Sequence, residues 1–302
     1  MNYTFTKIET EKIVGHFGQR FYEKMLDDLR FYTQKWQLEI IEVVDYFSVN
    51  CIFICTSKTL GEVVLKIGNP EDSVLAEAQT LKEYDGRRLC RLFDFDTVRG
   101  GILEECIRPG TRLREEKSLE KRLSVFSELF NGLHIAPRDV TVYPTYFDWV
   151  SRITNYMQKE SEHRTLYLLM EKAKSICSSL CKKYPQKLLL HGDLHHDNLL
   201  RGTDNHYKII DPKGVVGDPI FDIPRFILNE FYDAETLSYD FYKTHVEKVA
   251  KILEKSLFIP EDTIKKCVFI ETALANCWNV ESREPPDLEA VLYAEAVMGN
   301  MR

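Results

Sequence analysis

The sequence predicts an α+β protein, in which a β-rich N-terminal part precedes a mostly helical C-terminal part. Short β-rich runs separated by polar breaks fill the N-terminal part, and helical spacing of apolar residues dominates after Arg108-Pro109-Gly110. A length of 302 residues favours two domains or lobes. We place them at 1–107, which opens with a helix over 6–34, and at 108–302.

Each element follows from a local pattern. Ile13, Phe17, Phe21 and Leu29 have helical spacing and predict the opening helix. β-rich runs predict strands at Leu38–Tyr46, Cys51–Thr56, Glu62–Ile67, Leu89–Phe95 and Gly101–Cys106. A helix is predicted between Pro70 and Gly86, because acidic residues fill its first turn. Further helices are predicted at 117–135, 145–158, 163–183, 235–256, 261–279 and 287–299.

Composition excludes several classes of protein. Hydrophobic residues make up 44% of the chain and charged residues 29%, which is typical of a globular protein. The net charge of −7 argues against nucleic acid as a partner. No long apolar run and no secretory signal is present, and the eight cysteines are interpreted as free thiols. We therefore expect a cytoplasmic protein without a membrane segment or an obligate protein partner.

One polar segment, Leu190-His191-Gly192-Asp193 through Asn198, carries the chemistry, together with Asp211 further on. Apolar runs flank it and predict a strand, a loop and a pair of short strands. Phosphoryl transfer needs a carboxylate beside the attacking hydroxyl and hard oxygen ligands for Mg²⁺. We interpret Asp193 as the base or orienting group and Asn198 and Asp211 as the metal ligands, because their spacing matches the kinase pattern.

Two alternatives compete with this interpretation. A polar loop whose Asp and Asn residues only cap turns is the simplest. It is disfavoured because three residues hold kinase spacing between apolar flanks. A two-metal hydrolase is the second, since His191, His195, His196 and Asp197 are close in sequence. It would leave the N-terminal sheet unexplained.

The N-terminal part supplies a candidate nucleotide site. Lys66 lies in an apolar strand, and Glu77 follows eleven residues later in a predicted helix, an arrangement that holds a lysine toward the α/β-phosphates. Glu83 is a weaker candidate for this pairing. Ser48 and Asn50 lie in the predicted phosphate-covering turn, although both are ordinary turn formers. The backbone of Glu105 and Ile107 would contact the base at the hinge.

The segments His191–Leu200, Ile210–Asp222 and Leu103–Gly110, with the pair around Lys66, resemble the aminoglycoside/hydroxyurea resistance kinase family, which includes streptomycin 6-phosphotransferases. This family is part of the aminoglycoside phosphotransferase branch of the protein-kinase-like superfamily. The resemblance implies a bilobal fold with an antiparallel N-lobe sheet, one N-lobe helix and a mostly helical C-lobe. It also implies ATP or GTP with Mg²⁺, Asp193 as the catalytic aspartate, and Lys213 as a phosphate or substrate contact.

The resemblance favours a small hydroxyl substrate, and most of all an aminoglycoside such as streptomycin, with antibiotic resistance as the role. Asp218, Asp222 and Glu230 are the candidates for binding a cationic substrate. Further acidic candidates are Glu271, Glu281 and Glu295. Two alternatives stay open: a kinase for a non-antibiotic metabolite, and a nucleotide-binding sensor without turnover.

Overall fold

The computed structural model describes residues 3–45, 49–69, 72–231 and 237–299, and the chain divides into two compact units. The first unit comprises Met1–Thr111 with Arg201–Ile210, and the second comprises Arg112–Leu200 with Asp211–Arg302. The first division between the units therefore lies between Thr111 and Arg112, whereas the sequence predicted the lobe boundary between residues 107 and 108. A later segment of the chain also returns to the first unit.

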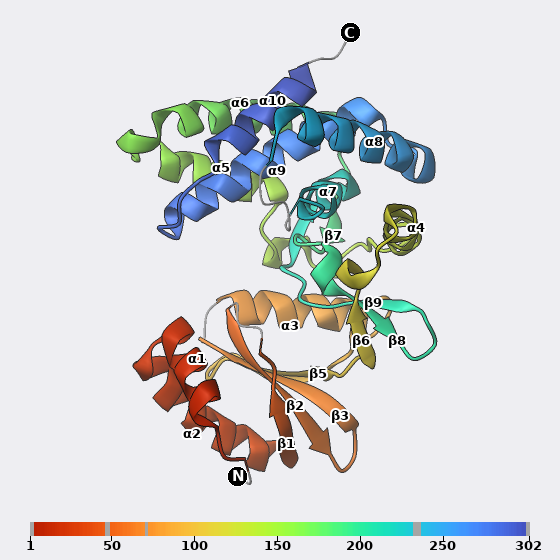
Figure 1. Ribbon diagram of the computed structural model, residues 1–302. Coiled ribbons are helices and arrows are strands. Elements are labelled where there is room, and N and C mark those ends of the chain that lie inside the picture. Colours follow the sequence, from red (N-terminus) through yellow and green to blue (C-terminus); the bar gives the residue numbers. More distant parts are fainter. Residues whose placement is uncertain (1–2, 46–48, 70–71, 232–236, 300–302) are drawn as a thin grey trace. The chain divides into compact units, whose positions relative to one another are not determined.

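A five-stranded antiparallel sheet forms the centre of the first unit, with strand order β1-β2-β3-β5-β4 (Figure 1). Its strands are β1 (Leu38–Val43), β2 (Asn50–Ser57), β3 (Gly61–Gly68), β4 (Leu92–Asp96) and β5 (Gly101–Glu105). Its helices are α1 (Lys7–Phe17), α2 (Gln19–Lys35) and α3 (Asp72–Tyr84). α1 and α2 lie on one side of the sheet and α3 on the other, as Figure 1 shows.

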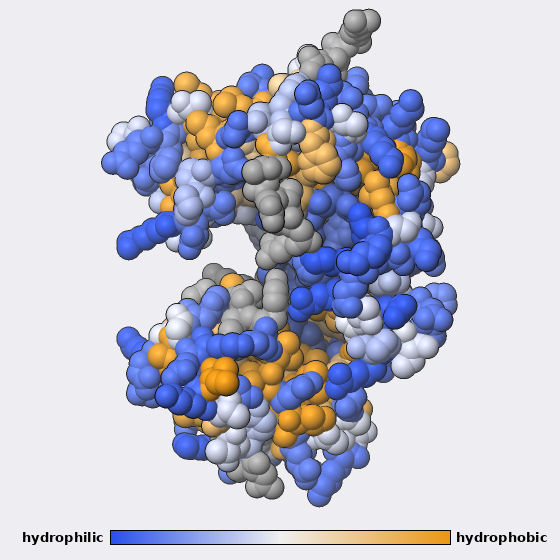
Figure 2. All heavy atoms as spheres, in the orientation of Figure 1, coloured by the Kyte–Doolittle hydropathy of each residue, from blue (hydrophilic) through white to orange (hydrophobic). Residues whose placement is uncertain are grey.

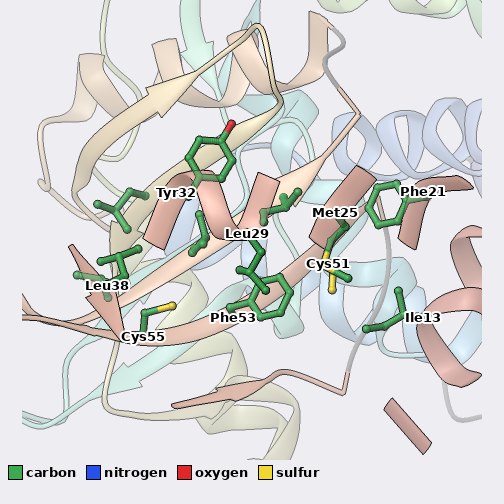
Figure 3. Close-up of a cluster of buried hydrophobic side chains, with 13 residues drawn as sticks. Ile13, Phe21, Met25, Leu29, Tyr32, Leu38, Cys51, Phe53 and Cys55 are labelled. Atoms are coloured by element: carbon green, nitrogen blue, oxygen red, sulfur yellow. The ribbon is translucent and has the colours of Figure 1, made fainter. Parts of the chain in front are cut away.

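The core of the first unit lies between α2 and the sheet (Figure 3). Alternate residues of β2, among them Cys51, Phe53 and Cys55, point to the same face because side chains of a strand alternate. Met25 and Leu29 of α2 pack against them. The opposite face of the sheet is thereby left for α3.

Two glycines explain details of this unit. A single helix over 6–34 was wrong, because Gly18 has φ +86° and divides the segment into α1 and α2. At Gly101, an added Cβ would lie only 2.3 Å from the Tyr32 ring. The Tyr32 ring of α2 therefore packs directly on the backbone of β5.

The second unit is mostly helical. Its helices are α4 (Leu119–Phe130), α5 (Tyr146–Met157), α6 (Arg164–Lys183), α7 (Ile223–Asn229), α8 (Tyr239–Leu257), α9 (Glu261–Glu281) and α10 (Leu288–Gly299). α9 packs against α5, α6, α7, α8 and α10, so it is the central helix. Consistent with this position, its buried residues lie on all sides of the helix, from Ile264 to Val280.

Short strands and turns connect these helices. β7 (Leu188–Leu190) pairs with β10 (Val215–Gly217), with Leu190 opposite Val215. β6 (Pro109–Arg112), β8 (Leu199–Gly202) and β9 (Tyr207–Ile209) form a second small sheet. The 3₁₀ helices are η1 (Leu113–Glu115), η2 (Val140–Val142), η3 (Ser161–His163), η4 (His196–Asn198) and η5 (Pro219–Asp222).

Hydrophilic residues predominate on the face drawn in Figure 2, and hydrophobic side chains appear there in small groups. Among the residues that the structure describes, no helix combines the length and the apolarity needed to cross a membrane.

Candidate active site

Lys66 is a buried cation in the first unit. Its neighbours Leu65 and Ile67 belong to the core on the α2 side, so strand alternation turns Lys66 toward α3. The Nζ atom donates a 2.6 Å hydrogen bond to Glu77 Oε1 of α3. The expected lysine–glutamate pair is therefore present, and only 3% of the Lys66 side chain is exposed.

Sequence reasoning missed a second carboxylate on Lys66. Glu104 Oε1 of β5 lies 2.9 Å from Nζ, and 3% of the Glu104 side chain is exposed. β3 and β5 are adjacent strands, and Glu104 faces Val64 across them. The sequence feature that could have indicated this contact is an acidic residue directly after the apolar pair Ile102 and Leu103, which are buried. A buried acidic residue requires a partner of opposite charge.

The other predicted nucleotide contacts lie elsewhere in this unit. Asn50 begins β2, and its Oδ1 covers Gly68, where an added Cβ would lie 2.0 Å away. The Glu105 carboxylate accepts two 2.7 Å hydrogen bonds from Lys208, and Ile107 is buried. Ser48 lies outside the described residues. The side chain of Glu105 thus joins β5 to β9, and its backbone amide donates a 2.9 Å hydrogen bond to the Arg91 carbonyl oxygen.

In the second unit, β7 leads into the segment that we name the His191–Asn198 loop. Asp222 holds the start of this loop, because its carboxylate accepts backbone hydrogen bonds from His191 (2.8 Å) and Gly192 (2.7 Å). His134 Nε2 contacts the same carboxylate at 2.9 Å. Burial would raise the pKa of Asp222, but His134, His191 and the Gly192 amide lower it, so the carboxylate is ionised.

Gly192 has no room for a side chain. Its φ is +79°, and an added Cβ would lie 2.8 Å from Trp149 Cη2 and 3.0 Å from Val215 Cγ1. Both the left-handed backbone and the contact with the indole require glycine here. The loop is also tied to the following strand region, because Lys213 N donates a 2.7 Å hydrogen bond to the His191 carbonyl oxygen.

Asp193 presents a partly exposed carboxylate, with 22% of its side chain accessible. Arg225 Nε lies 3.3 Å from Oδ1, and His195 Nε2 lies 3.7 Å from the same atom. Burial would raise the pKa of Asp193, but His195, Arg225 and Lys213 outweigh it and hold the pKa below its usual range. The carboxylate is therefore ionised at neutral pH and can orient a hydroxyl group.

Asn198 lies directly beside Asp193, since its Nδ2 donates a 2.9 Å hydrogen bond to the Asp193 carbonyl oxygen. Asp211 follows β9 with φ +60°, a left-handed conformation that aspartate tolerates better than most residues. The amide oxygen of Asn198 and the carboxylate of Asp211 are hard oxygen donors, and Mg²⁺ commonly takes only one or two such protein ligands. This donor set fits Mg²⁺.

The two-metal hydrolase is not supported. Within the described part of the chain, no group of three or more His, Cys, Asp or Glu side chains is placed to hold a metal ion. His191 Nδ1 accepts a hydrogen bond from Asp193 N, and His196 contacts Glu230 at 2.7 Å. These histidines hold the loop.

The three carboxylates predicted to bind a cationic substrate are engaged within the fold. Asp222 anchors the loop, as described above, and is fully buried. Glu230 is 4% exposed and contacts Arg122 (2.5 Å) and His196 (2.7 Å). Asp218 caps η5 through the Ile220 amide and lines a cavity of about 160 Å³ that includes no residue of the His191–Asn198 loop. Asp222 and Glu230 are buried against internal partners and present no surface to a ligand, so their expected contact with substrate is corrected. Asp218 keeps its buried Oδ2 atom without a hydrogen-bond partner in the described part of the chain, but the cavity that it lines lies apart from the His191–Asn198 loop.

The further acidic candidates are also paired. Glu281 contacts Arg152 at 2.6 Å and Glu295 contacts Lys172 at 2.8 Å. Glu271 is buried and lies 2.9 Å from Arg225. Arg225 was missed by sequence reasoning, although one cation between apolar residues of α7 was a usable signal.

Residues 38–282 match a family model described as aminoglycoside/hydroxyurea antibiotic resistance kinase. A hydroxyurea phosphotransferase of Kitasatospora aureofaciens is 25% identical over 73% of this chain and 66% of that protein. A streptomycin 6-kinase of Streptomyces griseus is 26% identical over 53% of this chain and 52% of that protein. The chain therefore matches less than two thirds of the length of these relatives.

The fold is that of protein-kinase-like small-molecule kinases. An amicoumacin kinase solved in complex with AMP-PNP, Ca²⁺ and Ami superposes with a TM-score of 0.62. The likeness covers 92% of this chain and 94% of that one at 12% identity. The antiparallel sheet of the first unit and the helices of the second agree with the predicted fold class.

Proposed function

The chain belongs to the aminoglycoside/hydroxyurea antibiotic resistance kinase family, and on this premise we propose that it transfers the γ-phosphate of ATP to a hydroxyl group of a small molecule. The observation that carries the proposal is the ionised, partly exposed carboxylate of Asp193 on a loop that Asp222 and Asn198 hold in place. These features argue against the alternative in which Asp193 only caps a turn, because a turn-capping aspartate needs neither an arginine beside it nor an anchored loop.

The reaction requires a positioned acceptor. The acceptor oxygen forms a bond to the γ-phosphorus, the bond from that phosphorus to the β,γ-bridging oxygen breaks, and ADP leaves with that oxygen. Asp193 accepts the hydrogen bond of the attacking hydroxyl and takes its proton, which then passes to solvent. Its lowered pKa makes it a weak base, so we assign it mainly an orienting role.

Asn198 and Asp211 would hold Mg²⁺, which neutralises phosphate charge during transfer. Lys66, held by Glu77, would contact the α/β-phosphates. Ser48, Asn50 and Lys213 are proposed as further phosphate contacts, and the backbone of Glu105 and Ile107 as the base contact. We propose ATP as the donor and retain GTP as the alternative.

The acceptor has two candidates. Streptomycin is the substrate in the name of one relative, and hydroxyurea in the name of the relative that covers more of the chain. The first is a polycation and the second is small and uncharged. A non-antibiotic metabolite, or a sensor role without turnover, is the remaining alternative.

The test is ADP release with Mg·ATP or Mg·GTP across hydroxyurea, streptomycin, choline and sugars. We expect turnover with at least one acceptor and its loss in Asp193→Ala, while Asp262→Asn, an exposed aspartate of the same unit, stays active. Equal turnover in Asp193→Ala would exclude the mechanism. Nucleotide binding without turnover on any acceptor would favour the sensor.

A further inference from the structure

Arg225 is held beside Asp193 by three helices of the second unit. Its Nε lies 3.3 Å from Asp193 Oδ1 and 2.9 Å from Glu271 Oε1. Glu271, on α9, is buried, and its Oε2 accepts a 2.6 Å hydrogen bond from Tyr146 of α5. α5 and α7 both pack against α9 (Figure 1), so the helices that carry Tyr146, Arg225 and Glu271 are in contact with one another through α9.

The outer end of the guanidinium is available. Nε is buried, yet 29% of the Arg225 side chain is exposed. Nη1 and Nη2 have no hydrogen-bond partner in the described segments, and neither is a buried unpaired atom. Two donor groups of one planar fork therefore reach the surface next to the Asp193 carboxylate.

An aromatic pair adjoins the arginine. The Trp278 ring centroid lies 5.7 Å from Arg225 Cζ, and Trp149 meets Trp278 edge-on with centroids 5.7 Å apart. Both indoles are half-buried, and Trp149 also touches Gly192 of the loop. The aromatic pair therefore extends from the loop to Arg225, with the two indole rings nearly perpendicular to each other.

Arg225 is one of the basic side chains near Asp193. Besides Arg225, the exposed Lys213 acts electrostatically on Asp193. Asp222, Glu230 and Glu271 are buried against internal partners and are not available to a ligand. Asp193 and Asp211 are partly buried, so a cationic acceptor group next to Asp193 would meet the Arg225 guanidinium as well as these carboxylates.

We propose that Arg225 determines acceptor specificity by binding a carbonyl or carboxylate oxygen next to the reacting hydroxyl. This inference rests on the proposed function and names the substrate class of that site: uncharged or anionic hydroxy compounds that carry such an oxygen. The fork of Nη1 and Nη2 matches this oxygen, and like-charge repulsion excludes a cationic group in the same place.

The test compares acceptors of different charge. Hydroxyurea and glycerate carry the required oxygen, whereas choline and streptomycin are cationic. ADP release yields kcat/KM for each acceptor, and calorimetry with Mg·ADP measures binding of acceptors that are not turned over. The variants are Arg225→Gln, Arg225→Lys and Arg225→Gln with Glu271→Gln, which avoids an unpaired buried carboxylate. Arg164→Gln, an exposed arginine of α6, is the control.

We expect the wild type to favour hydroxyurea or glycerate over both cations. Arg225→Gln should lower kcat/KM or affinity for the favoured acceptor by about 100-fold, mainly through KM, and leave the cations unchanged or improved. Arg225→Lys should retain part of the preference, and Arg164→Gln all of it.

Two results would overturn the inference while leaving the kinase function intact. The first is a wild-type preference for cations. The second is an equal loss for all acceptors in the double variant, since that pattern means that Arg225 only supports Asp193 or contacts phosphate. If the wild type neither binds Mg·ATP nor releases ADP with any acceptor, the proposed function fails, and the inference fails with it.

Discussion

Asn198 Nδ2 donates a 2.9 Å hydrogen bond to the backbone carbonyl oxygen of Asp193. This bond joins two residues that the sequence singled out separately, one as catalytic and one as a metal ligand. Because the amide NH₂ group is used in this way, the amide oxygen is the atom that remains for a metal. In the proposed function Asn198 would therefore have two distinct roles, which substitutions can separate.

We predict that Asn198→Asp retains metal binding but loses loop rigidity. The carboxylate cannot donate to the Asp193 carbonyl, and we expect about 1–3 kcal/mol lower stability together with a fall in kcat. The KM for Mg·ATP should change little, whereas Asn198→Ala should raise it as well. Urea unfolding and steady-state kinetics measure these effects. Wild-type stability in Asn198→Asp would mean that the bond contributes nothing.

Gly192→Ala should destabilise the protein and abolish turnover. The new methyl group would lie 2.8 Å from Trp149 Cη2, and φ of +79° adds a cost of about 1–2 kcal/mol. Trp149→Leu in the same chain should relieve the clash with the indole only, because Val215 Cγ1 would still lie 3.0 Å from the new methyl group. Gly15→Ala, in α1 with nothing within 4 Å, is the matched control and should stabilise by about 1 kcal/mol. Thermal unfolding checks both changes, and unaltered stability in Gly192→Ala would contradict the packing described.

Lys66→Met should leave two buried carboxylates without their shared cation. Glu77 and Glu104 both contact Lys66 Nζ, so we expect a loss of about 3–5 kcal/mol in the free energy of unfolding and loss of turnover. Adding Glu104→Gln should recover part of the stability but none of the activity. Denaturant unfolding together with ADP release separates the two effects. A double variant no more stable than Lys66→Met would show that Glu104 is not coupled to the lysine.

Glu230 should make stability depend on acidic pH. Burial would raise its pKa, but His196 and Arg122 lower it from an ordinary 4.5 to about 2. A carboxylate with a depressed folded-state pKa stabilises the fold above its unfolded value, and this contribution is lost as pH falls from 4.5 toward 2. The shift corresponds to about 3 kcal/mol.

Glu230→Gln should therefore be less stable than wild type at pH 7, and the difference should shrink as pH falls below 4.5. Denaturant unfolding at pH 7, 5 and 3.5 measures this difference. Glu284→Gln, an exposed glutamate of the same unit, should show no such dependence. A gap between wild type and Glu230→Gln that stays constant with pH would refute the role assigned to Glu230.

Local patterns were sufficient for much of the fold. Strand alternation around Lys66 and helical spacing after residue 117 predicted elements close to β3 and α4–α6, because both periodicities arise from the geometry of single segments. Element ends were less accurate: α4 ends at Phe130, where the sequence predicted 135. The opening helix was also divided, since a glycine at positive φ is not visible in an apolar pattern.

By itself, the sequence determined the fold class and predicted the central residues of the candidate site, because short motifs such as His191-Gly192-Asp193 carry their chemistry within a few consecutive positions. Only the tertiary structure decided which charges are available. In sequence, Asp222 and Glu230 both resemble exposed acids. In the structure, the Asp222 carboxylate contacts the His191 backbone and His134, and the Glu230 carboxylate contacts Arg122 and His196, so neither is available to a ligand. Arg225, in contrast, has two donor groups without a hydrogen-bond partner among the described residues. Burial and pairing depend on residues distant in the chain, so only packing decided which charged side chains remain accessible.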